Sequence, residues 1–118
     1  MRFERFRVVC LCGSGQFKDV FERENERLTL GGYIVLAPGC FRFHRKNAEF
    51  VPVLGKTRKT MLDKMHLQKI DMADEVFVLN VGGYVGESTR REIEYAKKSG
   101  KPVLWLEPGH DEVAGGDS

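Results

Sequence analysis

In residues 7–15 the chain reads RVVCLCGSG, an apolar run that ends in three small residues. Nearly every side chain from 8 to 12 is apolar or β-branched, which is the pattern of a strand buried on both faces of a sheet. The small residues after it are typical of a tight turn from a strand into a helix. Residues 7–12 are therefore expected to form the first strand of a parallel sheet.

The rest of the chain alternates between helical and strand patterns. Apolar residues at helical spacing predict helices over 17–30, 57–73 and 87–99, and short apolar runs predict strands over 33–37, 75–79 and 102–106. The segment 40–55 mixes aromatic and basic residues and is expected to be a long loop. Alternating strands and helices imply right-handed parallel crossovers. The predicted fold is α/β, a small three-layer doubly wound (flavodoxin- or Rossmann-like) parallel sheet of about four strands with helices on both faces.

Length and composition indicate one ordinary globular domain. The 118 residues are expected to form a single domain over 1–108, followed by a flexible Gly-rich and acidic tail over 109–118. The 19 Lys and Arg against 17 Asp and Glu give a net charge of +2, which does not favour nucleic acid as a partner. No apolar stretch approaches the roughly 20 residues of a membrane helix. No signal-peptide pattern opens the chain, so a cytoplasmic location without membrane contact is expected.

The cysteine pattern favours no covalent or metal framework. Cys10, Cys12 and Cys40 are odd in number and lack the paired spacing of a disulfide scaffold or a zinc site. A C-x-C pair can chelate a soft metal, but the sequence shows no second pair to complete a tetrahedral set. Cys10 and Cys12 are expected to be buried strand residues. We therefore predict no metal and no other cofactor.

Two glycine-rich turns are the candidate ligand site. In open parallel sheets, ligands bind beyond the carboxyl ends of the strands, where helix N-termini direct backbone N–H groups outward. One such turn follows the first predicted strand, and the other follows the third. A plain tight turn between strand and helix is the simpler interpretation of the first turn taken alone. The candidate substrate-binding residues are Gly13, Ser14, Gly82, Gly83, Tyr84, Gly86, Glu87 and Ser88.

Glu92, just after the second turn, has two interpretations. Thr89 and Glu92 have the T-x-x-E spacing of a capping box, in which each would satisfy the other's backbone donor. Alternatively, Glu92 borders the helix face that Ile93 turns toward the sheet, so its carboxylate would face the ligand cleft. The nearby helix N-terminus would then favour the ionised form that a nucleophile needs.

These motifs resemble those of the nucleoside 2-deoxyribosyltransferase-like superfamily. The shared residues are the glycine turn followed by EIEYA over 92–96 and GKP over 100–102, with ADEV over 73–76 before it. The nucleoside-monophosphate N-glycosidases of this superfamily also match Cys12-Gly13-Ser14. The resemblance spans about Val8 to Leu106.

The resemblance implies that Glu92 attacks the anomeric carbon of a deoxyribosyl or ribosyl group. Water or another base would resolve the covalent intermediate, as in retaining glycoside hydrolysis. The family commonly places an Asp for base contact or proton transfer in the helix before the third strand, and His66 holds that position here. His66 could act as an acid near neutral pH or be a surface helix residue, and Asp71 is a competing candidate. A small nucleoside or nucleotide substrate and a homodimer or larger assembly are also implied.

One departure from the family leaves other functions open. Six residues before Glu92, where the transferases use an Asp and the glycosidases a Ser to contact the sugar, this chain has Gly86. A non-catalytic nucleotide-binding or sensing module is therefore an alternative. A third is a phosphoribohydrolase similar to the Lonely Guy type, whose G-G-x-G-T-x-x-E motif is echoed by Gly82-Gly83 and residues 89–92, with extra residues between.

Overall fold

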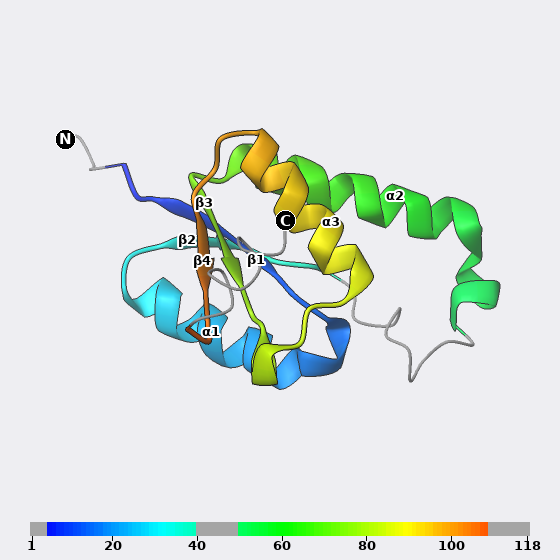
Figure 1. The fold of residues 1–118 in the computed structure, drawn as a ribbon, viewed down its shortest axis with the longest axis horizontal. Coiled ribbons are helices and arrows are strands. Elements are labelled where there is room, and N and C mark those ends of the chain that lie inside the picture. Colours follow the sequence, from blue (N-terminus) through cyan, green and yellow to red (C-terminus); the bar gives the residue numbers. More distant parts are fainter. Residues whose placement is uncertain (1–4, 40–49, 109–118) are drawn as a thin grey trace.

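The computed structural model describes residues 5–39 and 50–108, which form an α/β fold around an all-parallel four-stranded sheet (Figure 1). The elements in chain order are β1 (Val8–Cys12), η1 (Gly15–Phe17), α1 (Lys18–Leu30), β2 (Ile34–Leu36), α2 (Phe50–Met72), β3 (Glu75–Val78), η3 (Val81–Gly83), α3 (Glu87–Lys98) and β4 (Val103–Trp105). The predicted fold class is confirmed.

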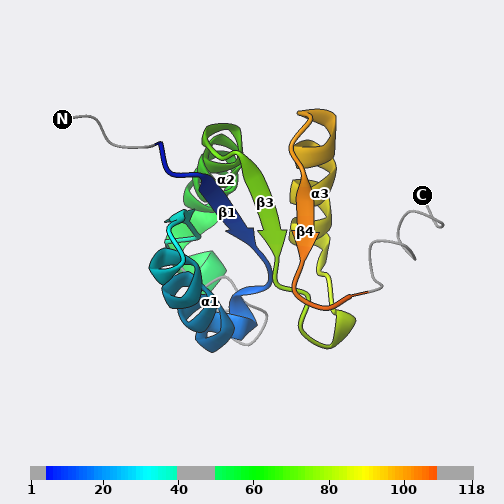
Figure 2. The same cartoon turned by 90° about the vertical axis from the view of Figure 1, so that its left-hand side faces the viewer.

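The strand order is β2-β1-β3-β4, which makes β1 and β3 the central strands. Figure 2 shows β1, β3 and β4 side by side in this order. After β2 the chain crosses to the other side of β1, so α1 covers one face of the sheet while α2 and α3 cover the other (Figure 1). The direction of winding reverses between β1 and β3. Sheets of this type bind ligands at the carboxyl ends of the strands beside such a switch point.

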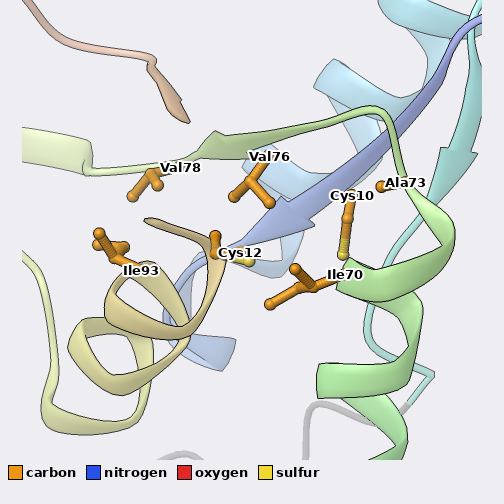
Figure 3. Packing of buried hydrophobic residues seen from close by; sticks show 8 residues of the cluster. Cys10, Cys12, Ile70, Ala73, Val76, Val78 and Ile93 are labelled. Carbon is orange, nitrogen blue, oxygen red and sulfur yellow. The ribbon is translucent and has the colours of Figure 1, made fainter. Parts of the chain in front are cut away.

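The two faces of β1 contribute to two separate apolar layers. Val9 and Leu11 pack with residues of α1, including Phe21. Cys10 and Cys12 point to the opposite face, where they lie on the same side of β1 as residues of α2 and α3 (Figure 3). Because successive strand residues face opposite sides, the run 8–12 is buried on both faces, as its pattern predicts.

The predicted elements are confirmed to within one or two residues at their ends, with one exception. The segment 40–55 is not a loop throughout, because α2 begins at Phe50. Pro52 and Gly55 resemble helix breakers in the sequence, but proline is tolerated in the first turn, where backbone N–H groups have no partner within the helix. The rest of that predicted loop, and the predicted tail over 109–118, lie outside the described residues. Within the described ranges, no helix is both long enough and apolar enough to cross a membrane.

Asp74 joins the start of β1 to the start of β3. Its carboxylate accepts hydrogen bonds from the Val8 backbone N–H at 2.8 Å and from Arg5 Nη2 at 2.9 Å. Its own backbone N–H donates to the Val8 carbonyl at 2.7 Å. The hydrogen bond from Arg5, followed by that from Val8, lowers the pKa of Asp74 below its usual value. Asp74 therefore stabilises the fold in its ionised form.

Replacing Asp74 should destabilise the protein in a pH-dependent way. Because the pKa of Asp74 is lower in the folded state, its contribution is complete above the unfolded value of about 3.9 and is lost as the pH falls through the folded value. Asp74→Asn should therefore lower the urea midpoint at pH 7, and the gap to wild type should close in acid. A gap that is the same at pH 7 and pH 3 would contradict this role.

Candidate functional site

The candidate site lies where α2 and α3 pack over the carboxyl end of β1. His66 precedes the buried Ile70 by one turn of α2, and Glu92 precedes the buried Ala96 by one turn of α3. Residues four apart share a helix face, so both polar side chains are directed toward the sheet. Cys12, the last residue of β1, faces them from below.

His66 Nε2 is the centre of this cluster. It lies 3.4 Å from Cys12 Sγ and 3.8 Å from Cys10 Sγ. It also lies 3.7 Å from Glu92 Oε1. Only 6% of His66 is exposed, so the interpretation of it as a surface residue is wrong. The structure thus brings together Glu92 and His66, two of the three predicted catalytic residues, and adds two thiols.

Each titratable group of the cluster has a shifted pKa. The contact with the Cys12 thiol, against the effect of burial, lowers the pKa of Cys10 to about 6. The same contact, together with burial, raises the pKa of Cys12 well above its usual value. Burial raises the pKa of Glu92, although the charge of His66 opposes this. Burial would lower the pKa of His66, but the Cys10 sulfur and Glu92 outweigh it and the pKa is raised. Burial and close charge partners are the physical causes throughout.

Glu92 separates two cavities. One, of about 160 Å³, is bordered by the turn after β2 and by the side of α2 that carries His66 and Lys69. The other, of about 290 Å³, lies between α2 and α3 and includes Ser88. Glu92 and Asp63 line both cavities. Asp63 lies one turn before His66, so it is a second carboxylate at the same boundary.

The capping-box interpretation of Glu92 is wrong. Helix α3 begins at Glu87 with Gly86 as its N-cap, and no side chain caps it. Thr89 is buried in the first turn, inside the helix rather than at its cap. Glu92 therefore lies too far into α3 to bond the N-cap backbone, and its carboxylate instead reaches His66.

The turn after β3 is held by the segment after β4. Gly82 and Gly83 have φ values of 64° and 82°, which only glycine adopts without strain. The Gly82 N–H donates to the Glu107 carboxylate at 2.8 Å. The fully buried Asn80 donates to the Glu107 carbonyl and accepts from the Glu107 N–H. The predicted binding residues Gly82 and Gly83 thus lie in a turn that hydrogen bonds to Glu107 hold in place.

Of the other predicted binding residues, Ser88 lines the larger cavity, and Tyr84, Gly86 and Glu87 lie in or next to the turn after β3. Tyr84 packs edge-to-face on Phe17, with ring centroids 6.1 Å apart, and so connects the turn after β3 with η1. Gly86 lies against Tyr84, since a Cβ there would be 3.2 Å from the tyrosine oxygen. Glu87 is largely exposed and its carboxylate lies 3.4 Å from Arg91 Nη1.

The turn after β1 has a clear structural role. Gly13 lies so close to β3 that a Cβ would be 3.3 Å from Leu79. The Ser14 hydroxyl accepts hydrogen bonds from the Gln16 backbone N–H at 3.3 Å and from the Gln16 side chain at 3.2 Å, which caps η1. Tight packing and capping account for both residues without a ligand.

Asp71 is not part of the cluster. Its carboxylate oxygens accept hydrogen bonds from the Tyr95 hydroxyl at 2.8 and 2.9 Å. It borders neither of the two cavities that Glu92 lines. The structure therefore separates this competing candidate from Glu92 and favours His66.

Sequence reasoning did not include Cys10, Cys12 or Asp63 in the site. The two cysteines are buried in β1, as predicted, but their contact with His66 depends on the packing of α2. One signal was available: residues two apart in a strand face the same side, so the C-x-C pair directs both thiols to one layer. The position of Asp63, one helical turn before His66, was a second signal.

No protein-family model matches the chain, and no curated protein is significantly similar to it. The geometry of the site is therefore the basis for assigning a function.

The positive φ of Gly82 yields a stability prediction. Alanine at this position would have open space around its Cβ, so the left-handed backbone alone should cost about 1 kcal/mol. Gly82→Ala should lower the free energy of unfolding by that amount in urea titration. Gly39→Ala is the matched control, because Gly39 also has open space but no positive φ. Equal losses in the two variants would contradict the backbone explanation.

Proposed function

We propose that the protein cleaves the N-glycosidic bond of a nucleoside or nucleotide, with Glu92 as the nucleophile. The observation that carries this proposal is the position of the Glu92 carboxylate, which is in contact with His66 and lines both the smaller cavity next to the turn after β2 and the larger cavity between α2 and α3. The resemblance to the nucleoside 2-deoxyribosyltransferase-like superfamily supports the same role for this residue.

The proposed reaction has two steps. The ionised Glu92 carboxylate attacks the anomeric carbon, the carbon–nitrogen bond breaks, and the base leaves with the bonding electron pair and gains a proton. A water molecule or a second base then attacks the same carbon and releases Glu92. Water as the acceptor makes the protein a hydrolase, and a base makes it a deoxyribosyltransferase.

His66 serves this reaction in two ways. Its positive charge, 3.7 Å from Glu92, favours the ionised carboxylate in a place where burial opposes ionisation. It also lines the smaller cavity together with Glu92, so it is within reach of a base bound there and can supply the proton. Asp63, which lines both cavities, is suited to accept a hydrogen bond from a sugar hydroxyl or a base N–H.

Two lysines of the smaller cavity, whose lining also holds the carboxylates of Asp63 and Glu92, are the candidate contacts for the phosphate of a nucleoside monophosphate. They are Lys59 and Lys69. Their ammonium groups donate hydrogen bonds to the Asp63 carboxylate and the Ala37 carbonyl, respectively. A 5′-phosphate would be attracted to these ammonium groups.

A second candidate, nucleotide binding without turnover, is favoured by one observation. Gly86 stands where the related enzymes have a sugar-contacting side chain, and Tyr84 packs over it. A sugar bound here would lack that contact, so its anomeric carbon would be held less firmly in position for attack. Calorimetric titration with nucleotides distinguishes the two functions when combined with an assay of released base.

Glu92→Gln should abolish base release. The amide cannot act as a nucleophile, so the rate with deoxynucleoside monophosphates should fall by more than about 100-fold while the fold persists. Chromatography of the free base measures the rate. Glu26→Gln makes the same chemical change on the exposed face of α1, across the sheet, and should leave the rate unchanged.

The outcomes separate the candidate functions. Undiminished base release in Glu92→Gln would exclude the proposed nucleophile. Nucleotide binding by the wild type without any base release would favour the non-catalytic module. Release of free ribose 5-phosphate, rather than a deoxyribose product, would favour the phosphoribohydrolase alternative.

A further inference from the structure

Four side chains with metal-ligating atoms converge beneath α2 and α3. They are the thiols of Cys10 and Cys12 from β1, the imidazole of His66 from α2 and the carboxylate of Glu92 from α3. The two sulfurs and the imidazole nitrogen all lie within 4.8 Å of one another. We propose that these four residues form a binding site for one Zn²⁺ or a similar thiophilic divalent cation.

The spacing of the donor atoms fits a tetrahedral site. With Zn–S bonds of about 2.3 Å and Zn–N bonds of about 2.0 Å, tetrahedral geometry requires a sulfur–nitrogen separation of about 3.6 Å. His66 Nε2 lies 3.4 Å from Cys12 Sγ and 3.8 Å from Cys10 Sγ. A nitrogen–oxygen pair requires about 3.3 Å, and Nε2 lies 3.7 Å from Glu92 Oε1. A cation could therefore bind among the two sulfurs and the imidazole nitrogen, which all lie within 4.8 Å of one another, and the Glu92 carboxylate would move closer to the sulfurs to become the fourth ligand.

The donor set selects the kind of metal. Two sulfurs, one imidazole nitrogen and one carboxylate oxygen are ligands that Zn²⁺ takes in proteins. Thiolates disfavour Mg²⁺ and Ca²⁺, which prefer oxygen ligands. The C-x-C pair alone is incomplete in the sequence, and the fold supplies the missing two ligands from helices.

The hydrogen bonding of the His66 ring is incomplete. Within the described part of the chain, its Nδ1 atom is buried and has no hydrogen-bond partner. A buried polar atom without a partner is costly. The usual structural role of a core histidine, in which both ring nitrogens are satisfied, therefore does not account for this residue.

A route to the site exists. Cys10 and Cys12 are fully buried, whereas His66 and Glu92 line the cavity of about 160 Å³. A cation entering through that cavity meets Glu92 and His66 first and the thiols last. The thiols at the inner end of this route would select thiophilic cations.

Metal binding goes beyond the proposed function and does not depend on it. If the proposed function holds, the two uses of Glu92 exclude each other, since a carboxylate bound to a cation cannot attack carbon. The loaded protein would then release no base until a chelator removes the metal. Binding itself is measured without any substrate.

The test is titration of the reduced, metal-free protein with Co²⁺ and then Zn²⁺. Wild type should bind one equivalent of Co²⁺, with the charge-transfer absorption of cobalt thiolates and the visible bands of a tetrahedral ion, and Zn²⁺ should displace it. Cys40→Ser, the matched control for the third cysteine, should behave as wild type. Cys12→Ser and His66→Gln should bind more than about 100-fold more weakly, a larger loss than removal of an outer-shell partner causes.

Because Cys12 and His66 are buried, circular dichroism must establish that these variants fold. A measurement on wild type alone avoids that question: one equivalent of Zn²⁺ should raise the melting temperature, because it binds only the folded state, and Mg²⁺ should not. The proposal is overturned if wild type binds neither Co²⁺ nor Zn²⁺ at micromolar concentration. It is also overturned if folded Cys12→Ser keeps the full charge-transfer absorption or if Cys40→Ser loses it.

Discussion

The structure depends on the burial of β1 on both faces. As a central strand it pairs with β2 on one side and β3 on the other, so neither of its edges is open. Val9 and Leu11 hold α1 against one face, and Cys10 and Cys12 hold α2 and α3 against the other. The positions of all three helices, and of the switch point between β1 and β3, follow from this strand.

Burial also determines the chemistry of the site. The layer between β1 and the two helices is apolar and includes Ile70 and Ile93. The polar groups within it therefore interact with one another rather than with water. Low solvation strengthens each interaction of His66 with the thiols and with Glu92. In water these side chains would have their usual pKa values. Buried together, they have shifted pKa values and interact with one another's charges.

Much of the fold was predictable because it is encoded in local patterns. The strand at 75–78, for example, is a short apolar run bounded by Asp74 and the glycine turn, and its burial on both faces is visible from composition alone. Residues 50–55 were mispredicted because the mix of aromatic and basic residues over 40–55 shows no helical spacing, although α2 begins at Phe50 and proline is tolerated in its first turn. For Glu92, the spacing to Thr89 could not reveal the role, since the same spacing fits a cap or a site until the first residue of α3 is known.

The sequence by itself determined the order of strands and helices, the glycine turns and the place of Glu92 just after the second turn, because each is encoded in residues close together along the chain. Only the tertiary structure decided that Cys12 and His66, 54 residues apart, are in contact. It also decided that the Asp71 carboxylate accepts a hydrogen bond from Tyr95 and lies outside the cluster. The physical reason is that packing distances between α2, α3 and β1 arise from the whole core. No local periodicity specifies which polar side chains of three elements meet at one point.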